Sequence, residues 1–298
     1  MIRPFEERDA AAIAEILREQ DPYHLYTPAR VLHEQTAHPE RAHFTWLVAE
    51  IDGAPVGCGW AELRWESGGG EVADVWAAVR SDYERRGLGR ALADALEAHA
   101  RAAGAGAAHT FALSGSRGEH FAATRGYEVT RREQAWELDP RKAKLPSVEA
   151  AVVPLTYLRD RAQDLFELFW TVESDIPGDF AWNGYSFEEW TRETWDDPTL
   201  DDETSVVALV DGRPASISWL VVDDERCLAE VEMTGTAPEF RGRGLARACK
   251  AESLRRAAER GIERVVTEND FENQAILHLN ESLGFRRSGV SLELAKPL

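Results

Sequence analysis

The chain has 298 residues, 44% of them hydrophobic, so its length allows two domains of ordinary size with sizeable cores. Its net charge of −19 argues against nucleic acid or an anionic membrane as the main partner and suits an amine-bearing one, although solubility would explain the acidity equally well. The scattered cysteines and histidines lack metal spacing, and no run of 18 apolar residues or signal segment occurs. We therefore expect a cytoplasmic protein without a metal site or a membrane span.

The first half of the chain alternates predicted strands with predicted helices. Residues 21–43 show no clear hydrophobic period. Asp52-Gly53 predicts a tight hairpin turn. The expected elements are, in order, a strand at 2–4, a helix behind Asp9, a hairpin of 44–51 and 55–63, a strand at 72–79, a helix at 88–103, a strand at 109–113, a short helix at 119–125 and a strand pair within 127–137.

A proline-containing segment separates this half from a second one with the same plan. Residues 140–151 have no apolar period and predict a linker between domains at 1–139 and 152–298. The second half is expected to contain a strand at 152–155, a helix at 161–170, a hairpin of 206–210 and 214–222, a strand at 228–233, a helix at 245–260, a strand at 264–267, a helix at 273–283 and a strand at 289–295.

Three pairs of glycines test whether the plan is a true repeat. Gly53 and Gly212 in the hairpins lie 159 residues apart, and Gly87 and Gly244 after the central strands lie 157 apart. Gly126 and Gly284, each before an aromatic residue, lie 158 apart. The near-constant offset indicates a tandem duplication of one α+β unit with a mostly antiparallel sheet and flanking helices.

The most informative stretch is Thr234-Gly-Thr-Ala-Pro-Glu-Phe-Arg-Gly-Arg-Gly-Leu-Ala-Arg247, between a strand and a helix. Its glycines allow close approach of a ligand, and the following helix offers free N–H groups, so it suits a pyrophosphate. Arg241, Arg243 and Arg247 add positive charge. An ordinary turn with solvated arginines is the alternative, since the Walker ending and the third glycine of the dinucleotide fingerprint are absent.

Two motifs carry a family resemblance. Arg241-Gly-Arg-Gly-Leu-Ala246 and the helix and turn of Asn273-Gln-Ala-Ile-Leu-His-Leu-Asn-Glu-Ser-Leu-Gly-Phe285 resemble, in order and separation, those of GNAT-type N-acetyltransferases. The whole chain is similar to the tandem members of this superfamily, a group that includes mycothiol synthase. The resemblance implies two copies of the GNAT fold, each a mixed, mostly antiparallel sheet flanked by helices, and acetyl-CoA as the cofactor.

The resemblance also implies where the cofactor binds. Strand 230–235 would separate from strand 264–268, and the pantetheine arm would lie in the gap. Pyrophosphate would be held by the backbone of Gly242, Arg243, Gly244, Leu245, Ala246 and Arg247, with Arg241 beside it. The arm and thioester would be held by the main chain of Met233, Thr234 and Gly235 and by Asn269 and Asn273.

The same resemblance points to a general base on the strand before the loop. Counting back from the loop gives Glu230, and Glu232 lies two residues on, where it would share the strand face. Two neighbouring carboxylates would raise one pKa towards neutrality, although both could be ordinary surface acids. Asn280 stands where many relatives have a tyrosine that protonates the leaving thiolate, and an asparagine cannot supply that proton.

The first copy departs from this pattern. By the loop offset, Glu230 and Glu232 correspond to Ala73 and Val75, and Asn280 to Ala122. Arg85, Arg86, Gly87 and Gly89 keep an anion-binding character, but Glu84 replaces the first arginine. The first copy therefore either holds CoA without turnover or is structural only.

The acceptor side is less defined. In the insert 171–204, Asp175 and Trp182 would suit a small-molecule amine through charge and cation–π contact, and a plain surface loop is the alternative. We expect acetyl transfer to a primary amine by direct attack in the second domain, with a CoA- or metabolite-sensing module as the alternative. The duplication favours a monomer that resembles an internal dimer, or a weak homodimer.

Overall fold

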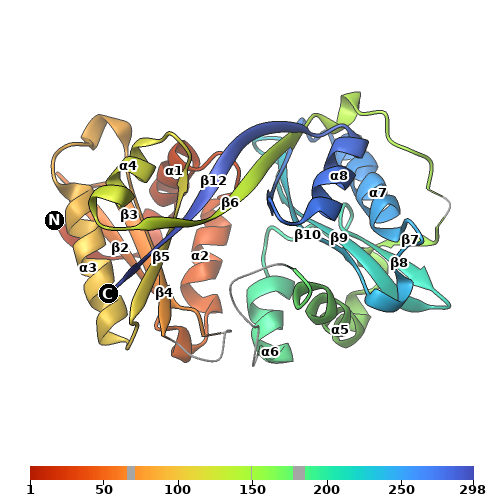
Figure 1. The fold of residues 1–298 in the computed structure, drawn as a ribbon, viewed down its shortest axis with the longest axis horizontal. Coiled ribbons are helices and arrows are strands. Elements are labelled where there is room, and N and C mark those ends of the chain that lie inside the picture. The colour runs from red at the N-terminus through yellow and green to blue at the C-terminus, as the bar shows by residue number, and fades with distance from the viewer. Residues whose placement is uncertain (66–70, 149, 177–184) are drawn as a thin grey trace.

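The computed structural model describes residues 1–65, 71–148, 150–176 and 185–298 and shows two lobes joined by two long crossing strands (Figure 1). The first half of the chain contains β1 (Ile2–Pro4), α1 (Ala10–Gln20), α2 (Pro28–Ala37), β2 (Thr45–Ile51), β3 (Ala54–Leu63), β4 (Val72–Val79), α3 (Leu88–Ala102), β5 (Ala107–Leu113), α4 (Arg117–Thr124) and β6 (Glu128–Leu138). The lobe that holds β1 to β5 is called the N lobe below.

The second half contains β7 (Val152–Pro154), α5 (Ala162–Glu173), α6 (Phe187–Trp190), β8 (Val206–Val210), β9 (Arg213–Asp223), β10 (Leu228–Thr236), α7 (Leu245–Arg260), β11 (Arg264–Asp270), α8 (Gln274–Leu283) and β12 (Arg286–Pro297). A π-helical turn, Thr191–Trp195, continues α6. The lobe that holds β7 to β11 is called the C lobe below. Each lobe thus combines sheet and helices in an α+β plan, as the sequence indicated.

The two lobes share one sheet because their last strands are exchanged. Within the described residues the sheet has 12 strands in the order β1-β2-β3-β4-β5-β12-β6-β11-β10-β9-β8-β7. β12, from the end of the chain, pairs antiparallel with β5, and β6, from the first half, pairs antiparallel with β11. Leu292 and Leu294 of β12 are buried in the N-lobe core, and Trp136 of β6 is buried in the C-lobe core. Each core is therefore completed by the other half of the chain.

The local turn predictions are confirmed. Asp52 and Gly53 have φ of 50° and 79°, and Asp211 and Gly212 have φ of 50° and 77°. Two successive positive φ values are those of the type I′ turn, whose twist matches that of the flanking strands. The predicted helix at 245–260 also has the observed bounds of α7.

One helix was not predicted, and one prediction is wrong. Residues 21–43 contain α2, which begins behind Thr27, whose hydroxyl accepts the Arg30 N–H, with Pro28 in the first turn. This proline and cap were the available helix signal. The strand pair expected within 127–137 is a single strand, β6, because its partner is β12 from the other half.

Candidate active site at the separated strands of the C lobe

The site lies where two parallel strands part. β10 and β11 pair only from Leu228 and Arg264 to Glu230 and Val266. Beyond these residues β10 continues along β9, and β11 continues along β6. The strands separate at Glu230, which is the opening that the family resemblance implied for the cofactor arm.

A β-bulge in β10 places the acidic residues. The register between β10 and β9 shifts between Val231 and Met233, so Glu232 is an extra residue without a partner opposite it. β4 pairs with β3 without such a shift. Glu230 is buried and Glu232 is exposed.

The bulge changes which N-lobe residue corresponds to Glu230. β4 and β5 pair from Val72 and Ala107 to Asp74 and His109, so Asp74 holds the last paired position that Glu230 holds in the C lobe. Ala73 and Val75 are buried in the N-lobe core, as Ala229 and Val231 are in the C-lobe core. Matching Glu230 to Ala73 was wrong by one residue, because the offset was counted from the loop across the inserted Glu232.

The glycine loop has the geometry of an anion cradle. Gly242 and Gly244 have φ of 74° and 73°, and Gly244 is the N-cap of α7. A Cβ at either glycine would meet no other atom within 4 Å, so the loop surface is open to a ligand. The first N–H groups of a helix lack intrahelical partners and attract anions. This backbone, from Gly242 to Arg247, fits a pyrophosphate.

The arginine that opens the loop is already paired. The guanidinium of Arg241 forms an ion pair with Asp175 and donates from Nε to the carbonyl of Thr236 at 3.1 Å. Asp175 was predicted to contact the acceptor amine, but in the structure it contacts Arg241 at the start of the glycine loop. Trp182 lies outside the described residues.

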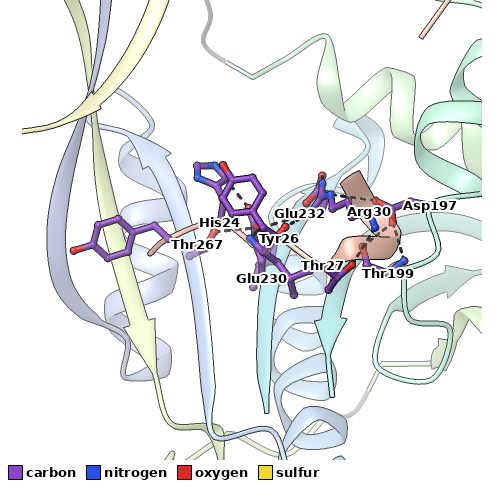
Figure 2. Close-up of polar contacts among 12 residues, drawn as sticks. His24, Tyr26, Thr27, Arg30, Asp197, Thr199, Glu230, Glu232 and Thr267 are labelled. Atoms are coloured by element: carbon purple, nitrogen blue, oxygen red, sulfur yellow. Dashed lines mark hydrogen bonds and ion pairs between the residues drawn. The ribbon is translucent and has the colours of Figure 1, made fainter. Parts of the chain in front are cut away.

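Glu230 is covered by a segment of the N lobe (Figure 2). Its Oε2 accepts the backbone N–H of Leu25 at 2.6 Å, and Arg30 Nη1 lies 3.8 Å from the same oxygen. Burial raises the pKa of Glu230 to about 7. His24 and Arg30 act to lower that pKa, and Glu232 adds to its rise. A carboxyl with this pKa can exchange protons near neutral pH.

Arg30 joins the two carboxylates of β10. Its Nη2 donates to Glu232 Oε1 at 3.0 Å, and its Nε lies 3.4 Å from Asp197 Oδ2 (Figure 2). Glu230 and Glu232 therefore both lie within 4 Å of the guanidinium of Arg30. The chief cause of the Glu230 shift, however, is burial under the N-lobe segment and not the neighbouring carboxylate.

A histidine completes the cover. His24 Nδ1 lies 2.8 Å from Asp21 Oδ2, and its Nε2 lies 3.8 Å from both Glu230 and Glu268. Partial burial acts to lower the pKa of His24. The surrounding carboxylates have the larger combined effect and hold this pKa well above the usual range. Tyr26 donates its hydroxyl hydrogen to the same Asp21 oxygen at 2.9 Å.

Sequence reasoning missed the segment from Asp21 to Arg30. This segment has no hydrophobic period, and its histidine, like the others of the chain, has no metal spacing that would single it out. Leu25 and Glu230 are 205 residues apart, so no local spacing could have joined them.

Two asparagines of the C lobe are hydrogen-bonded to each other. Asn280 is fully buried, and its Nδ2 donates to Asn269 Oδ1 at 2.7 Å. Asn273 is the N-cap of α8, and its Oδ1 accepts the Ile276 N–H at 3.4 Å. The structure thus brings Asn269 and Asn280 together and gives Asn273 a capping contact.

Other chemistries find no support in the part of the chain that the structure describes. Burial raises the pKa of the Cys249 thiol in α7 to about 12, so its nucleophilic form is suppressed. Among the described residues, no group of three or more His, Cys, Asp or Glu side chains is arranged to hold a metal ion. None of the helices in the described ranges is long and apolar enough to cross a bilayer.

Comparison with known families identifies the architecture. The family described as "Acetyltransferase (GNAT) family" matches this chain at residues 10–127 and again at residues 161–285. The two matches fall one in each half and together cover most of the chain. The chain belongs to the GNAT acetyltransferase family. It is a tandem GNAT N-acetyltransferase, and acyl-CoA is the acyl donor of this family.

Relatives of this GNAT protein extend over both lobes. A mycothiol acetyltransferase of Thermobifida fusca is 28% identical over 269 residues, which cover 82% of this chain and 80% of that protein. One from Stackebrandtia nassauensis is 27% identical and covers 99% of this chain and 98% of its own. A tandem GNAT protein from the clavulanic acid biosynthesis pathway has a TM-score of 0.74 at 18% identity, covering 100% of this chain and 98% of that chain.

Proposed function

We propose that the C lobe transfers an acetyl group from acetyl-CoA to the primary amine of a small molecule by direct attack. The observation that carries the proposal is Glu230, a buried carboxyl with its pKa raised to about 7, at the point where β10 and β11 separate. Acetyl-CoA supplies the activated acetyl group as a thioester.

Each part of the site has a role in this proposal. The backbone N–H groups from Gly242 to Arg247 bind the pyrophosphate, with Arg241 at the edge of the loop. The main chain of Met233, Thr234 and Gly235 holds the pantetheine arm and the thioester carbonyl. Asn269 and Asn273 border the arm on the β11 and α8 side.

Proton transfer is the main task of the protein's side chains. Glu230 as carboxylate takes a proton from the bound ammonium, directly or through a water, and frees the amine to attack. Glu232, held by Arg30, keeps negative charge near the amine. Asn280 donates a hydrogen bond and no proton, so the proton for the leaving thiolate comes from solvent or from the acceptor.

We assign catalysis to residues 152–298 and a supporting role to residues 1–139, with 140–151 as the connection. In the N lobe, Asp74 is held by Arg64 with 2.7 and 2.9 Å contacts, and Glu84 pairs with Arg117 beside the glycine loop. A carboxylate there opposes pyrophosphate binding at Arg85, Arg86, Gly87 and Gly89. Native mass spectrometry is expected to show one acetyl-CoA per chain and a monomer. Two bound molecules would overturn the supporting role.

The acceptor is tested with an amine panel. The mycothiol acetyltransferase relatives motivate the amine precursor of mycothiol as one member, beside aminosugars, aminoglycosides and polyamines. Release of free CoA thiol is measured for wild type, Glu230→Gln and the exposed control Glu225→Gln. Acetylation that is lost in the first variant and kept in the second is expected. Acetyl-CoA binding without turnover of any amine would support the sensing alternative instead.

A further inference from the structure

A buried lysine stands behind the asparagines of the C lobe. Lys250 on α7 is 1% exposed, and its Nζ donates to Asn280 Oδ1 at 2.6 Å. The same Nζ lies 5.1 Å from the centre of the Phe285 ring. Burial lowers the pKa of Lys250 to about 7, and no carboxylate of the described residues acts to raise it. A buried cation without a counterion is costly, so its place in the fold calls for a reason.

The lysine sets the direction of a hydrogen-bond chain. An ammonium can only donate, so Asn280 must turn its Oδ1 towards Lys250. Asn280 Nδ2 is then a donor, and Asn269 Oδ1 accepts it at 2.7 Å. The amide of Asn269 is thereby turned so that its own Nδ2 remains as a donor. A neutral amine could also accept, and the two amides could then flip.

This chain ends at the separated strands. Asn269 lies on β11 three residues beyond Val266, the last residue paired with β10. The N lobe lacks the arrangement, because Lys250 and Asn280 correspond to Ala93 and Ala122 at the offsets of 157 and 158 residues. Both alanines line a cavity of about 240 Å³ between β4, β5 and their helices.

We propose that Lys250 is a positioning residue of the acyl-CoA site: its ammonium orients Asn280 and Asn269 so that Asn269 offers an N–H donor to the gap between β10 and β11. The inference rests on the proposed function. Lys250 acts here as a hydrogen-bond donor and transfers no proton to the substrate. In its ammonium form, its positive charge, carried through two polarised amides, favours the departure of a thiolate from that gap.

Two variants test the chain. Lys250→Met removes the ammonium and keeps an unbranched apolar stem, but it leaves the buried Asn280 Oδ1 without this donor, so a modest fall in melting temperature is expected. Asn280→Asp keeps a partner for Lys250 but turns a carboxylate oxygen towards Asn269 Oδ1, which reverses the chain. Loss of a hydrogen bond to a charged group predicts about a tenfold or greater fall in kcat in each variant. Lys142→Met, at a 78% exposed lysine, is the charge control.

The outcomes separate positioning from packing. A lowered kcat in Lys250→Met that is still folded at the assay temperature, together with a lowered kcat in Asn280→Asp, supports the proposal. Wild-type kcat in either variant overturns the proposal. It is also overturned if Lys250→Met loses activity only because it unfolds and Asn280→Asp keeps wild-type kcat. If the wild-type protein acetylates no amine, the proposed function fails. Calorimetry of acetyl-CoA binding then tests whether Lys250 positions the acyl-CoA site. Weaker binding by both variants than by wild type and Lys142→Met supports its role, and equal binding overturns it.

Discussion

The two lobes open in the same way and hold different side chains at the opening. In each lobe two parallel strands pair over three positions and then part. The C lobe adds a bulge at Glu232 and a buried carboxyl, Glu230. In the N lobe, β4 pairs with β3 without a register shift, and Asp74 is hydrogen-bonded to Arg64. The comparison teaches that the fold supplies the gap, and that a one-residue insertion and a few side chains determine its chemistry.

The N lobe nevertheless contributes to the C-lobe site. Its segment from Asp21 to Arg30 buries Glu230 and brings His24 and Arg30 to it. Without that cover, Glu230 would be solvated and its pKa would lie nearer the ordinary value of about 4.3. The duplication thus yields one opening that holds a buried carboxyl and one lobe that covers this carboxyl.

The equivalent acids Glu230 and Asp74 allow the strongest test of this comparison. Glu230→Gln should lower kcat/KM by about 100-fold or more, because general-base catalysis contributes roughly 10²–10⁴. Asp74→Asn should leave kcat/KM within about twofold, since Arg64 already neutralises Asp74. Steady-state kinetics with saturating acetyl-CoA and a varied concentration of acceptor measures both. Equal losses would mean that the lobes share the chemistry.

The strand exchange predicts that the N lobe depends on the end of the chain. Leu292 of β12 is fully buried in the N-lobe core, so Leu292→Ala should lower the free energy of unfolding by about 2–5 kcal/mol. Amide hydrogen exchange should become faster in β5, which pairs with β12. Val129→Ala, at a 38% exposed position on neighbouring β6, should cost under about 0.5 kcal/mol. Denaturant titration that shows equal effects would contradict the exchange.

The pH dependence should report the buried acid of the C lobe. Glu230 must be deprotonated to act as base, and its pKa is raised to about 7. We therefore expect kcat/KM to increase as the pH is raised through about 7. Below that pH, kcat/KM should decrease about tenfold for each pH unit. Arg30 lowers this pKa, so Arg30→Met should move the rising limb to higher pH. A limb that keeps its position in Arg30→Met, or that persists in Glu230→Gln, would assign the titration to another group.

A single glycine sharpens the comparison of the central strands. A Cβ on Gly235 would lie 2.0 Å from Val172 Cγ1, because α5 packs closely on β10. The corresponding N-lobe residue, at the loop offset, is Ala78. Gly235→Ala should destabilise the protein by about 1–3 kcal/mol, the usual cost of overpacking. Val172→Ala in the same chain should recover most of the loss in melting temperature. Wild-type stability in Gly235→Ala alone would show that α5 moves freely.

Much of the site could be inferred from sequence because its signals are local. The loop at Gly242 and Gly244 and the helix that follows are encoded by adjacent residues that need particular φ values. The acids of β10 were found by counting back from that loop. The loop's Arg241 was found too, but its partner Asp175 depends on how α5 ends and could not be read from spacing.

The sequence by itself determined the duplication, the hairpin turns at Asp52 and Asp211, the glycine loops and the family. These features depend on backbone preferences of neighbouring residues and on a repeat that counting reveals. Only the tertiary structure decided that β6 and β12 are exchanged, that Glu232 is an inserted residue, and that the segment at Leu25 covers Glu230. The reason is physical. The strand exchange and the cover of Glu230 join residues more than 100 positions apart, a bulge is visible only in the pairing of two strands, and the pKa of a carboxyl follows its burial.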